Sequence, residues 1–281
     1  MAENKHQYRN PFLIMSGLPG KMATLVAETM LKQEDDFVVS TRALTGEGQP
    51  ISCDVSGTPF YLCGPEKHEG LLSSMVNKNP IVVDFSQPDA VNRNAELYCK
   101  FKIPFVMGTT GGDRKSLEKV VVDSGNIAVI APNMAKPVVL MQAMLEYAAQ
   151  SFPDALKGFN LNVTESHQQG KKDTSGTAKS MVEYFNKLGV GFDLGEIVKI
   201  RDPEFQTRLL RIPEEYLSGH GWHTYTLKSQ DKTVELGFTH NVNGRQVYAD
   251  GTLNAIRFLH SKLGEEKARG KAYSMIDVLR G

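Results

Sequence analysis

The sequence predicts an α/β protein with a doubly wound parallel sheet in its first half and a second α+β domain with a mixed or antiparallel sheet. Short apolar runs alternate with segments of helical periodicity in the first half. In the second half, apolar and polar residues alternate as in strands with one solvated face. Pro132 and Pro137 bracket a turn between the halves. We therefore expect two domains, with their boundary near Asn133–Pro137.

The first half contains apolar runs of strand length. They are Phe12–Met15, Phe37–Val39, Ile81–Phe85, Pro104–Met107 and Ile127–Ile130. A glycine turn follows the first run and opens a helix, and Asp89–Lys100 and Asp113–Val122 are predicted to be helices with Asp at the N-cap. Strand–helix–strand alternation implies parallel strands joined by right-handed crossovers, which is a Rossmann-like sheet.

The second half contains alternating runs and one helix between them. The runs are Gly158–Glu165, His223–Leu227, Val234–His240 and Gln246–Tyr248, and the helix carries Met181, Val182, Phe185 and Leu188 on one face. A final helix is predicted from Asp250, which would be its cap. The predicted domains are residues 1–134, completed by residues 250–281, and residues 135–249.

Composition excludes several classes of protein. Lys+Arg and Asp+Glu are both 32, so the net charge of zero gives no global attraction to nucleic acid or to an anionic membrane. No apolar run approaches the roughly 20 residues that cross a bilayer. Residues 1–6 are polar, so we expect no secretory or transit signal there. The expected compartment is a bacterial cytoplasm, or the plastid stroma if a transit peptide has been removed.

Cysteine and histidine usage gives no metal-ligand pattern. Cys53, Cys63 and Cys99 lack C-x-x-C spacing, which indicates a reducing compartment and neither a disulfide framework nor a zinc site. His220, His223 and His240 follow no recognised ligand spacing. We therefore expect no metal, and interpret these histidines as structural or as neighbours of a substrate.

The glycine turn Gly17–Ala23 is the first motif with chemical meaning. Glycines at the start of a helix let the backbone approach a pyrophosphate, although Pro19 removes one N–H from this turn. After the second predicted strand the chain has Arg42 where NAD-selective sites place an acid. A guanidinium suits a 2′-phosphate, which favours NADPH, with NADH as the alternative if Arg42 is a solvated loop residue.

The loop from Glu165 to Ala178 is the second motif. His167 and Lys171 lie in it, and a helix beginning near Ser175 would aim the amides of Gly176 and Thr177 at an anion such as a carboxylate. An imidazole and an ammonium beside a carboxylate pocket are suitable proton donors for a reduction. The alternative is a basic, solvated turn.

Together these motifs resemble those of the dihydrodipicolinate reductase family. The resemblance rests on Gly17–Met22, Asp84–Ser86, Met107–Gly112, Ala131–Met134 and Glu165–Ala178, which occur in that order and span nearly the whole chain. Phe105–Asp113, Ser218–His220 and Met275–Arg280 look most like the plant branch. The family reduces a cyclic dicarboxylic imine, 4-hydroxy-tetrahydrodipicolinate, with loss of water, in the diaminopimelate route to lysine.

The resemblance implies a role for each matching position. The pyrophosphate would lie on the glycine turn, and the nicotinamide and its ribose beside the segments after the fourth and fifth predicted strands. The implied cofactor residues are Gly17, Leu18, Pro19, Gly20, Lys21 and Met22, then Gly108, Thr109 and Thr110, and near the hinge Ala131, Pro132, Asn133 and Met134. Lys171 would be the general acid, assisted by His167. Gly176 and Thr177 would grip a substrate carboxylate, with Ser175 and Gln168 close by.

Departures from the bacterial pattern bear on the substrate residues. Gln168 stands where bacterial members carry a second His, and the turn before the helix is one residue shorter and lacks a Pro. Arg245, after a tight turn, is a candidate for a second carboxylate or an exposed hairpin residue. The family assembles through the sheet of its second domain, which predicts a homotetramer formed by the strands between His223 and Tyr248.

Two other functions compete with the reductase. A semialdehyde dehydrogenase would need an activated cysteine, and none of the three lies at the predicted domain junction. A catalytically silent NADPH-binding relative with an assembly or regulatory role would have lost His167 or Lys171, and both are present.

Overall fold

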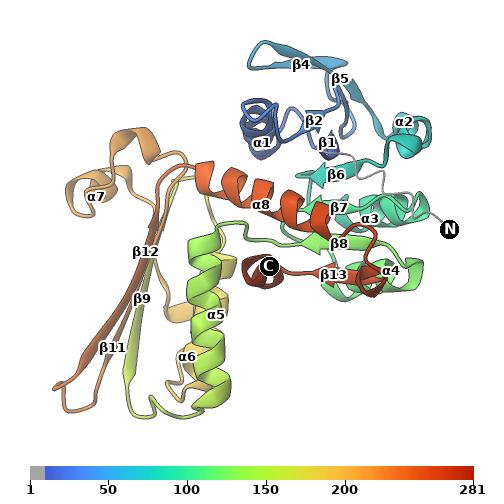
Figure 1. The fold of residues 1–281 in the computed structure, drawn as a ribbon. Coiled ribbons are helices and arrows are strands. Elements are labelled where there is room, and N and C mark those ends of the chain that lie inside the picture. The colour runs from blue at the N-terminus through green and yellow to red at the C-terminus, as the bar shows by residue number, and fades with distance from the viewer. Residues whose placement is uncertain (1–9) are drawn as a thin grey trace. The chain divides into compact units, whose positions relative to one another are not determined.

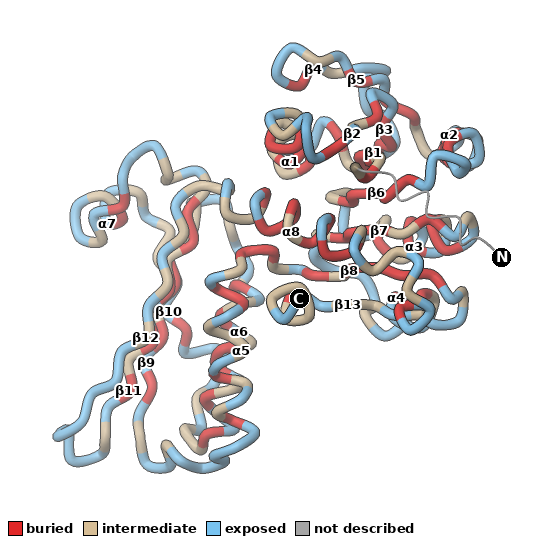
Figure 2. Tube along the Cα trace, viewed as in Figure 1, coloured by how far each residue is buried: buried red, intermediate tan, exposed pale blue. Residues whose placement is uncertain are grey.

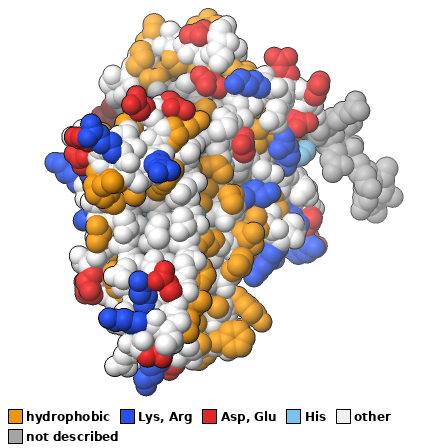
Figure 3. Space-filling view, turned by 90° about the vertical axis from the view of Figure 1, so that its left-hand side faces the viewer, with side chains coloured by type: hydrophobic (Ala, Val, Ile, Leu, Met, Phe, Trp, Pro, Cys, Tyr) orange, Lys and Arg blue, Asp and Glu red, His pale blue; other side chains and the backbone are white. Residues whose placement is uncertain are grey.

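The computed structural model describes residues 10–281, and the chain divides into two compact units (Figure 1). One unit comprises the described residues up to Ala135 together with Tyr248–Gly281, and the other comprises Lys136–Val247. The polar start at residues 1–6 lies outside the described part of the chain. No helix within residues 10–281 is long and apolar enough to cross a membrane. On the face shown in Figure 3, side chains of both charges are interspersed.

The first unit is built on a large, mostly parallel sheet, which confirms the predicted fold class. Its strands lie in the order β13-β8-β7-β6-β1-β3-β5-β4, β2 pairs with β1, and only the β4–β5 pair is antiparallel. The strands are β1 (Phe12–Ser16), β2 (Val38–Val39), β3 (Arg42–Leu44), β4 (Ser52–Val55), β5 (Thr58–Cys63), β6 (Ile81–Asp84), β7 (Phe105–Met107), β8 (Ile127–Ile130) and β13 (Lys271–Tyr273).

The sequence predicts an Asp N-cap for three helices of this unit; the structure confirms one of these caps and contradicts the other two. The helices are α1 (Lys21–Leu31), α2 (His68–Met75), α3 (Val91–Lys100), α4 (Arg114–Ser124), α8 (Gln246–Lys262) and α9 (Met275–Arg280). Asp113 caps α4 as predicted, because its carboxylate accepts the amides of Lys115 and Ser116. The predicted Asp89 cap is wrong, since a turn from Gln87 to Ala90 leads into α3 instead.

Helix α8 corrects the sequence prediction at its start. The run Gln246–Tyr248 is not a strand but the first turn of α8, so Asp250 lies inside the helix and is not its N-cap residue. The glycine at position 251 allows a close approach in this part of the helix, because a Cβ there would stand 1.7 Å from the Met134 carbonyl oxygen. The backbone of α8 therefore packs directly on the segment after β8. The chain then continues into β13 and α9, so α8 is not the final helix.

The second unit is a four-stranded sheet with two helices on one face (Figure 1). Its strands, in spatial order, are β10 (Val198–Ile200), β9 (Asn160–His167), β11 (Gly221–Lys228) and β12 (Glu235–Val242), and its helices are α5 (Lys136–Ser151), α6 (Gly176–Lys187) and α7 (Pro203–Arg208). The β10–β9 pair is parallel and the others are antiparallel, so the predicted mixed sheet is confirmed.

Side-chain burial separates the two faces of this sheet. Leu161, Val163, Tyr225 and Leu227 are buried and pack with residues of α5 and α6, and Figure 2 shows buried positions recurring along β9 and β11. On β11 buried and more exposed residues alternate strictly, as the sequence pattern predicts. The apolar core therefore lies on one side of the sheet, and the other side presents mostly polar residues, with Trp222 at one end of β11 and Lys228 at the other.

Candidate functional site

The glycine turn lies at the mouth of a cavity of about 480 Å³ in the first unit. Gly17, Leu18, Pro19 and Gly20 line it, as the sequence predicts for a cofactor site. The remaining lining residues come from the end of β1, the segments after β3 and β6, and the helices α2 and α3; they include Ser16, Thr45, Glu47, Gln49, His68, Ser86, Gln87, Asp89 and Arg93. Lys21 and Met22 belong to the first turn of α1 and are not among them.

Two observations indicate that the glycine turn at this cavity can bind the pyrophosphate of a dinucleotide. No side chain caps the first turn of α1, and this turn contains no acid, so its amide groups are available to an anion. Gly17 has a φ of +106°, and a Cβ there would stand 2.3 Å from the Phe85 carbonyl oxygen. The turn is thus held close to the segment after β6, in a conformation that only glycine adopts without strain.

Asp84 fixes that facing segment. It is fully buried at the end of β6, and its carboxylate accepts hydrogen bonds from the Ser86 amide at 2.9 Å and hydroxyl at 2.7 Å. Asn94 and the Tyr98 hydroxyl bond the other carboxylate oxygen at 3.0 and 2.6 Å. The acid that opens the Asp84–Ser86 motif therefore has a structural role here, which the sequence alone does not reveal.

The placement predicted for Arg42 is wrong. The prediction requires β2 to end beside the cofactor end of β1, but β2 has two residues and pairs with Phe12 and Leu13 at the far end of β1. The strand beside Ser16 is β3, which Arg42 begins rather than ends. Arg42 is exposed and does not line the cavity, whereas Glu47 in the loop after β3 does.

The other predicted cofactor residues lie at the carboxyl ends of β7 and β8. Gly108 bonds the Asp84 carbonyl through its amide at 2.9 Å, and Ala131 bonds the Met107 carbonyl at 3.0 Å, which aligns these strand ends along one sheet edge. Thr109 is buried and its hydroxyl lies 3.3 Å from an Asp84 carboxylate oxygen, while Thr110 is exposed. The segment Ala131–Met134 follows β8 directly. None of these residues lines the 480 Å³ cavity.

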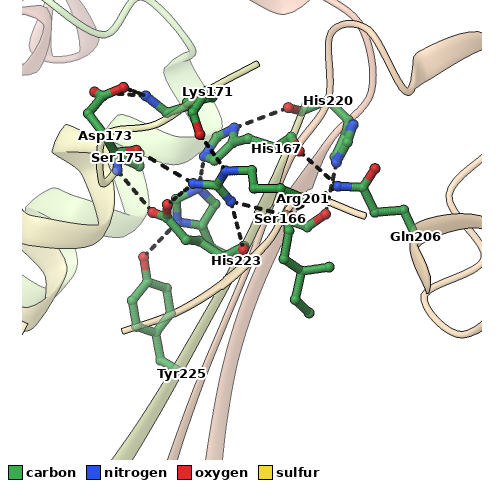
Figure 4. A network of polar contacts seen from close by, with 12 residues as sticks. Ser166, His167, Lys171, Asp173, Ser175, Arg201, Gln206, His220, His223 and Tyr225 are labelled. Atoms are coloured by element: carbon green, nitrogen blue, oxygen red, sulfur yellow. Dashed lines mark hydrogen bonds and ion pairs between the residues drawn. The ribbon is translucent and has the colours of Figure 1, made fainter. Parts of the chain in front are cut away.

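In the second unit, β9 and α6 bring the predicted proton donors and the helix N-terminus onto one loop. His167 ends β9, Lys171 lies in the loop, and Ser175 is the N-cap of α6, with Gly176 and Thr177 in its first turn (Figure 4). The Lys171 ammonium bonds both carboxylate oxygens of Asp173, at 3.0 and 2.9 Å. This contact lowers the pKa of the Asp173 carboxyl.

A buried ion pair ties this loop to the sheet. Glu165 is fully buried, and its carboxylate accepts the Ser175 amide at 2.9 Å and pairs with Arg201. The Arg201 Nε in turn donates to the Lys171 carbonyl at 2.8 Å. Gln206, also buried, donates from its side-chain amide to the His167 carbonyl at 2.8 Å. Sequence reasoning missed Arg201 and Gln206, because they lie about 30 residues beyond the loop with no motif of their own.

The histidines form a chain of hydrogen bonds with defined tautomers. The His167 Nδ1 lies 3.2 Å from the His220 carbonyl oxygen, which only accepts, so Nδ1 carries the proton. In neutral His167 the Nε2 is then the acceptor, and the His223 Nε2, 3.0 Å away, is its donor. The remaining His223 nitrogen, Nδ1, accepts from the Tyr225 hydroxyl at 3.2 Å. Hydrogen bonds thus run from Tyr225 to His223 to His167.

Burial keeps these rings neutral. It lowers the pKa of His167 to about 4, against the opposing effect of the Glu165 carboxylate. It lowers the pKa of His223 further, and the pKa of His240, which stacks on His223 at 4.5 Å, to about 4. Burial also raises the pKa of the Tyr225 hydroxyl, so that group is a donor at neutral pH.

The same cluster contains a set of side chains with metal-ligand chemistry. One ligand atom from each of Glu165, His167 and His223 lies within 4.8 Å of the others. All three are engaged in the hydrogen bonds described above, so an ion would have to displace the Arg201 pair and the contact between the two rings.

The two remaining substrate candidates lie close to backbone groups. Gln168 is half-buried, and its carbonyl accepts the Lys171 amide at 3.0 Å, which closes the turn of the loop. Arg245 lies in the turn between β12 and α8 and donates to the Ser218 carbonyl at 3.1 Å. Arg245 is therefore held against the Ser218–His220 segment rather than being a freely solvated hairpin residue.

Comparison with known proteins decides the family. Residues 13–134 match the family described as "Dihydrodipicolinate reductase, N-terminus", and residues 137–279 match "Dihydrodipicolinate reductase, C-terminus". The chain belongs to the dihydrodipicolinate reductase family. The resemblance drawn from the motifs is thereby confirmed.

Relatives of this dihydrodipicolinate reductase family member include plant proteins. The chain is 47% identical to a probable 4-hydroxy-tetrahydrodipicolinate reductase 1, chloroplastic, of Oryza sativa, over 99% of this chain and 80% of the relative. It is 46% identical to the chloroplastic reductase 2 of Arabidopsis thaliana, over 95% and 77%. A dipicolinate-bound dihydrodipicolinate reductase from Paenisporosarcina shares the fold with a TM-score of 0.63 at 18% identity, over 90% of this chain and 95% of that structure.

Proposed function

We propose that this chain performs the family's reaction with Lys171 as proton donor, His167 as its partner, and the start of α6 as the carboxylate site. The reaction is the reduction of 4-hydroxy-tetrahydrodipicolinate to tetrahydrodipicolinate in lysine biosynthesis through diaminopimelate, so the chain is an oxidoreductase. The observation that carries the residue roles is the loop between β9 and α6, which joins an imidazole, an ammonium and a helix N-terminus.

The chemistry assigns a task to each group on this loop. Loss of the 4-hydroxyl group as water leaves a conjugated cyclic imine, and a reduced nicotinamide, when bound, would supply the hydride that this ring accepts. The ring becomes electron-rich, and the Lys171 ammonium stabilises that charge and gives a proton to the ring carbon. Its side chain is 21% exposed, so it is accessible to a ligand despite the ion pair with Asp173. His167 would assist proton traffic or polarise the substrate, and because burial keeps its ring neutral it would do so as a neutral imidazole.

A carboxylate of the substrate would bind at the first turn of α6. Gly176 and Thr177 stand there, no side chain caps the helix, and Ser175 is kept in place by Glu165. A helix N-terminus favours an anion through its amide groups and its dipole. Arg245 and Gln168 would contact the second carboxylate. Dipicolinate is the cyclic dicarboxylate bound in the Paenisporosarcina reductase, which supports this class of ligand.

The cofactor is a nicotinamide dinucleotide, and the first domain, residues 1–134 with 250–281, would hold it on the glycine turn. NADPH is the proposed preference. The guanidinium that would bind its 2′-phosphate is that of Arg93, which lines the cavity, rather than that of Arg42, which does not. Glu47 in the same cavity favours NADH as the alternative, because a carboxylate accepts hydrogen bonds from a ribose diol.

Assembly and compartment complete the proposal. The uncovered face of the second sheet carries Thr224, Thr226, Thr239 and Asn162, which are neighbours in register. This group of small uncharged residues, flanked on the same face by Trp222 and by the Lys228–Glu235 ion pair, suits a homotetramer formed through this sheet. The plant relatives are named as chloroplastic, which supports the plastid stroma as the compartment.

A coupled assay tests the proposal. Dihydrodipicolinate synthase supplied with its two substrates generates the ligand, and absorbance at the nicotinamide band reports oxidation of NADPH or NADH. Oxidation that requires the synthase, and that is lost in Lys171→Ala with cofactor binding retained, is expected. Turnover unchanged by Lys171→Ala would contradict the assigned role. Cofactor binding without any turnover would favour the silent relative.

A further inference from the structure

We propose that Arg201 is a positioning residue for this reaction, and that it acts by locking the loop of Lys171 and the start of α6 onto the end of β9. The inference rests on the roles proposed above for Lys171 and α6. Arg201 follows β10 in the chain, and Figure 4 shows its guanidinium at the centre of the network, in contact with the loop that carries Lys171.

Every N–H of the Arg201 guanidinium faces an acceptor. The Nε donates to the Lys171 carbonyl at 2.8 Å, and Nη1 lies 3.2 Å from the Glu165 carbonyl and 3.0 Å from the Ile200 carbonyl. The Nη2 pairs with the Glu165 carboxylate and reaches the Asp173 carbonyl at 3.5 Å. One planar group therefore connects β9, β10 and the loop, a geometry that five donors in a fixed fork allow and a lysine ammonium does not.

These contacts restrain the reacting groups through the backbone. Arg201 does not touch the Lys171 ammonium, which bonds Asp173, but it holds the carbonyl of the same residue. Its partner Glu165 holds the Ser175 amide, which is the N-cap of α6. The position of the proton donor and that of the carboxylate site thus depend on the same buried ion pair.

Gln206 extends the restraint to His167. It lies in α7 and is 1% exposed, and its amide bonds the His167 carbonyl at 2.8 Å and the Ile200 carbonyl at 3.2 Å. The segment from β10 to α7 therefore supplies two side chains that grip the backbone of the two proposed proton-handling residues. Arg208 and Glu204 on the same helix are exposed and pair with each other.

The test compares Arg201→Ala and Arg201→Lys with Arg208→Ala, a matched control from the same segment. Displacement of a reacting group by about 1 Å can cost on the order of 100-fold in rate. We expect kcat to fall by about that factor in both Arg201 variants, with the affinity for NADPH unchanged and that for dipicolinate reduced in titration calorimetry. Millimolar guanidinium should restore part of the activity of Arg201→Ala. Arg208→Ala should match the wild type.

A double variant separates positioning from charge neutralisation. Arg201→Ala leaves the Glu165 carboxylate buried without a partner, which itself threatens folding. Glu165→Gln combined with Arg201→Ala removes that charge and retains an acceptor for the Ser175 amide. If the double variant folds with wild-type kcat, Arg201 only neutralises Glu165 and the proposal is wrong; a folded double variant that stays slow supports it.

The outcomes also separate this inference from the proposed function. A wild-type chain without turnover would overturn the function, and dipicolinate affinity would still report whether Arg201 holds α6. Wild-type turnover with equal kcat and dipicolinate affinity in Arg201→Lys would overturn the positioning role alone.

Discussion

The Nε2 atoms of His167 and His223 lie 3.0 Å apart, so one of the two rings must donate to the other. The carbonyl at the other side of His167 assigns the donor role to His223. A donor aimed at Nε2 stabilises the neutral form of His167 and opposes its protonation. His223, which the sequence alone left between a structural role and a place near the substrate, therefore favours the neutral form of a proposed proton-handling residue, in addition to the burial that lowers the pKa of His167.

His223→Phe should raise the pKa of His167 above its present value of about 4. The change removes the hydrogen bond to Nε2 and leaves a ring of similar size in the buried position. Titration of the His167 ring protons by NMR measures the shift directly. His260→Phe, a change on α8, serves as the control. A pKa of His167 that stays constant or falls in His223→Phe would show that burial alone sets it.

His240 should make the protein less stable in acid. Its two ring nitrogens are buried without a hydrogen-bond partner among the described residues, and burial lowers its pKa from 6.5 to about 4. The unfolded chain then binds more protons than the folded one between these values, so stability falls as the pH drops through this window. The expected loss is on the order of 1 kcal/mol at pH 5 after allowance for partial exposure.

His240→Phe should reduce that loss, because phenylalanine keeps the stack on His223 and does not titrate. Urea unfolding at pH 7 and pH 5 measures the difference for both proteins. Burial also lowers the pKa values of His167 and His223, so part of the loss of stability in acid will remain in the variant. An unchanged pH dependence in the variant would mean that His240 is solvated when folded.

Gly17→Ala should weaken cofactor binding by about 10-fold or more, which corresponds to about 1.4 kcal/mol. A Cβ at this position meets the Phe85 carbonyl at 2.3 Å and the backbone has a φ of +106°, so the turn must move. Gly46→Ala is the matched control, since Gly46 lines the same cavity and a Cβ there meets nothing within 4 Å. Fluorescence titration with NADPH compares them, and equal affinities would place the dinucleotide elsewhere.

The sequence predicts the fold well wherever periodicity is strong. The buried runs at β1, β6, β7 and β8 and the alternation along β9 and β11 are clear because each strand has one or two buried faces. Short strands such as β2 and β3 contain too few residues to show a pattern of alternating burial. The sequence therefore could not separate them, which is why the predicted placement of Arg42 is wrong. The first turn of α8 was misinterpreted because Gln246–Tyr248 alternates like a strand.

The candidate site could be predicted only where its residues are contiguous. The glycine turn and the loop from His167 to Thr177 each lie on one stretch of sequence. Arg201, His223 and Gln206 reach the loop through strand pairing and side-chain packing, which no local pattern records. The burial that lowers the pKa of His167 likewise depends on residues distant in the chain.

Thr226→Arg should disrupt the proposed tetramer without unfolding the chain. Thr226 lies on the uncovered face of the second sheet, opposite Asn162 on β9 and Gly237 on β12. A large cation among the small side chains around Thr226 would be buried in the proposed interface, which is costly. Light scattering after size exclusion measures the mass. Lys232→Arg, at an exposed turn, is the control, and a tetramer that survives Thr226→Arg would locate the interface elsewhere.

Cofactor selectivity should depend on Glu47 and Arg93 and not on Arg42. Glu47→Ser removes a carboxylate from the cavity, which abolishes its repulsion of a 2′-phosphate and its hydrogen bonds to a ribose diol. We therefore expect the ratio of kcat/KM for NADPH to that for NADH to rise by about 10-fold, or about 1.4 kcal/mol. Arg93→Ala should lower this ratio by weakening NADPH binding alone.

Arg42→Ala is the matched control for both variants, because it removes an exposed guanidinium outside the cavity. It should leave both cofactors unaffected, as expected from its place at the start of β3. A selective loss of NADPH affinity in Arg42→Ala, with none in Arg93→Ala, would return the 2′-phosphate to the position that the sequence first indicated. If neither Arg42→Ala nor Arg93→Ala loses NADPH affinity, selectivity is set by Glu47 alone, through repulsion of the 2′-phosphate rather than its attraction to a guanidinium.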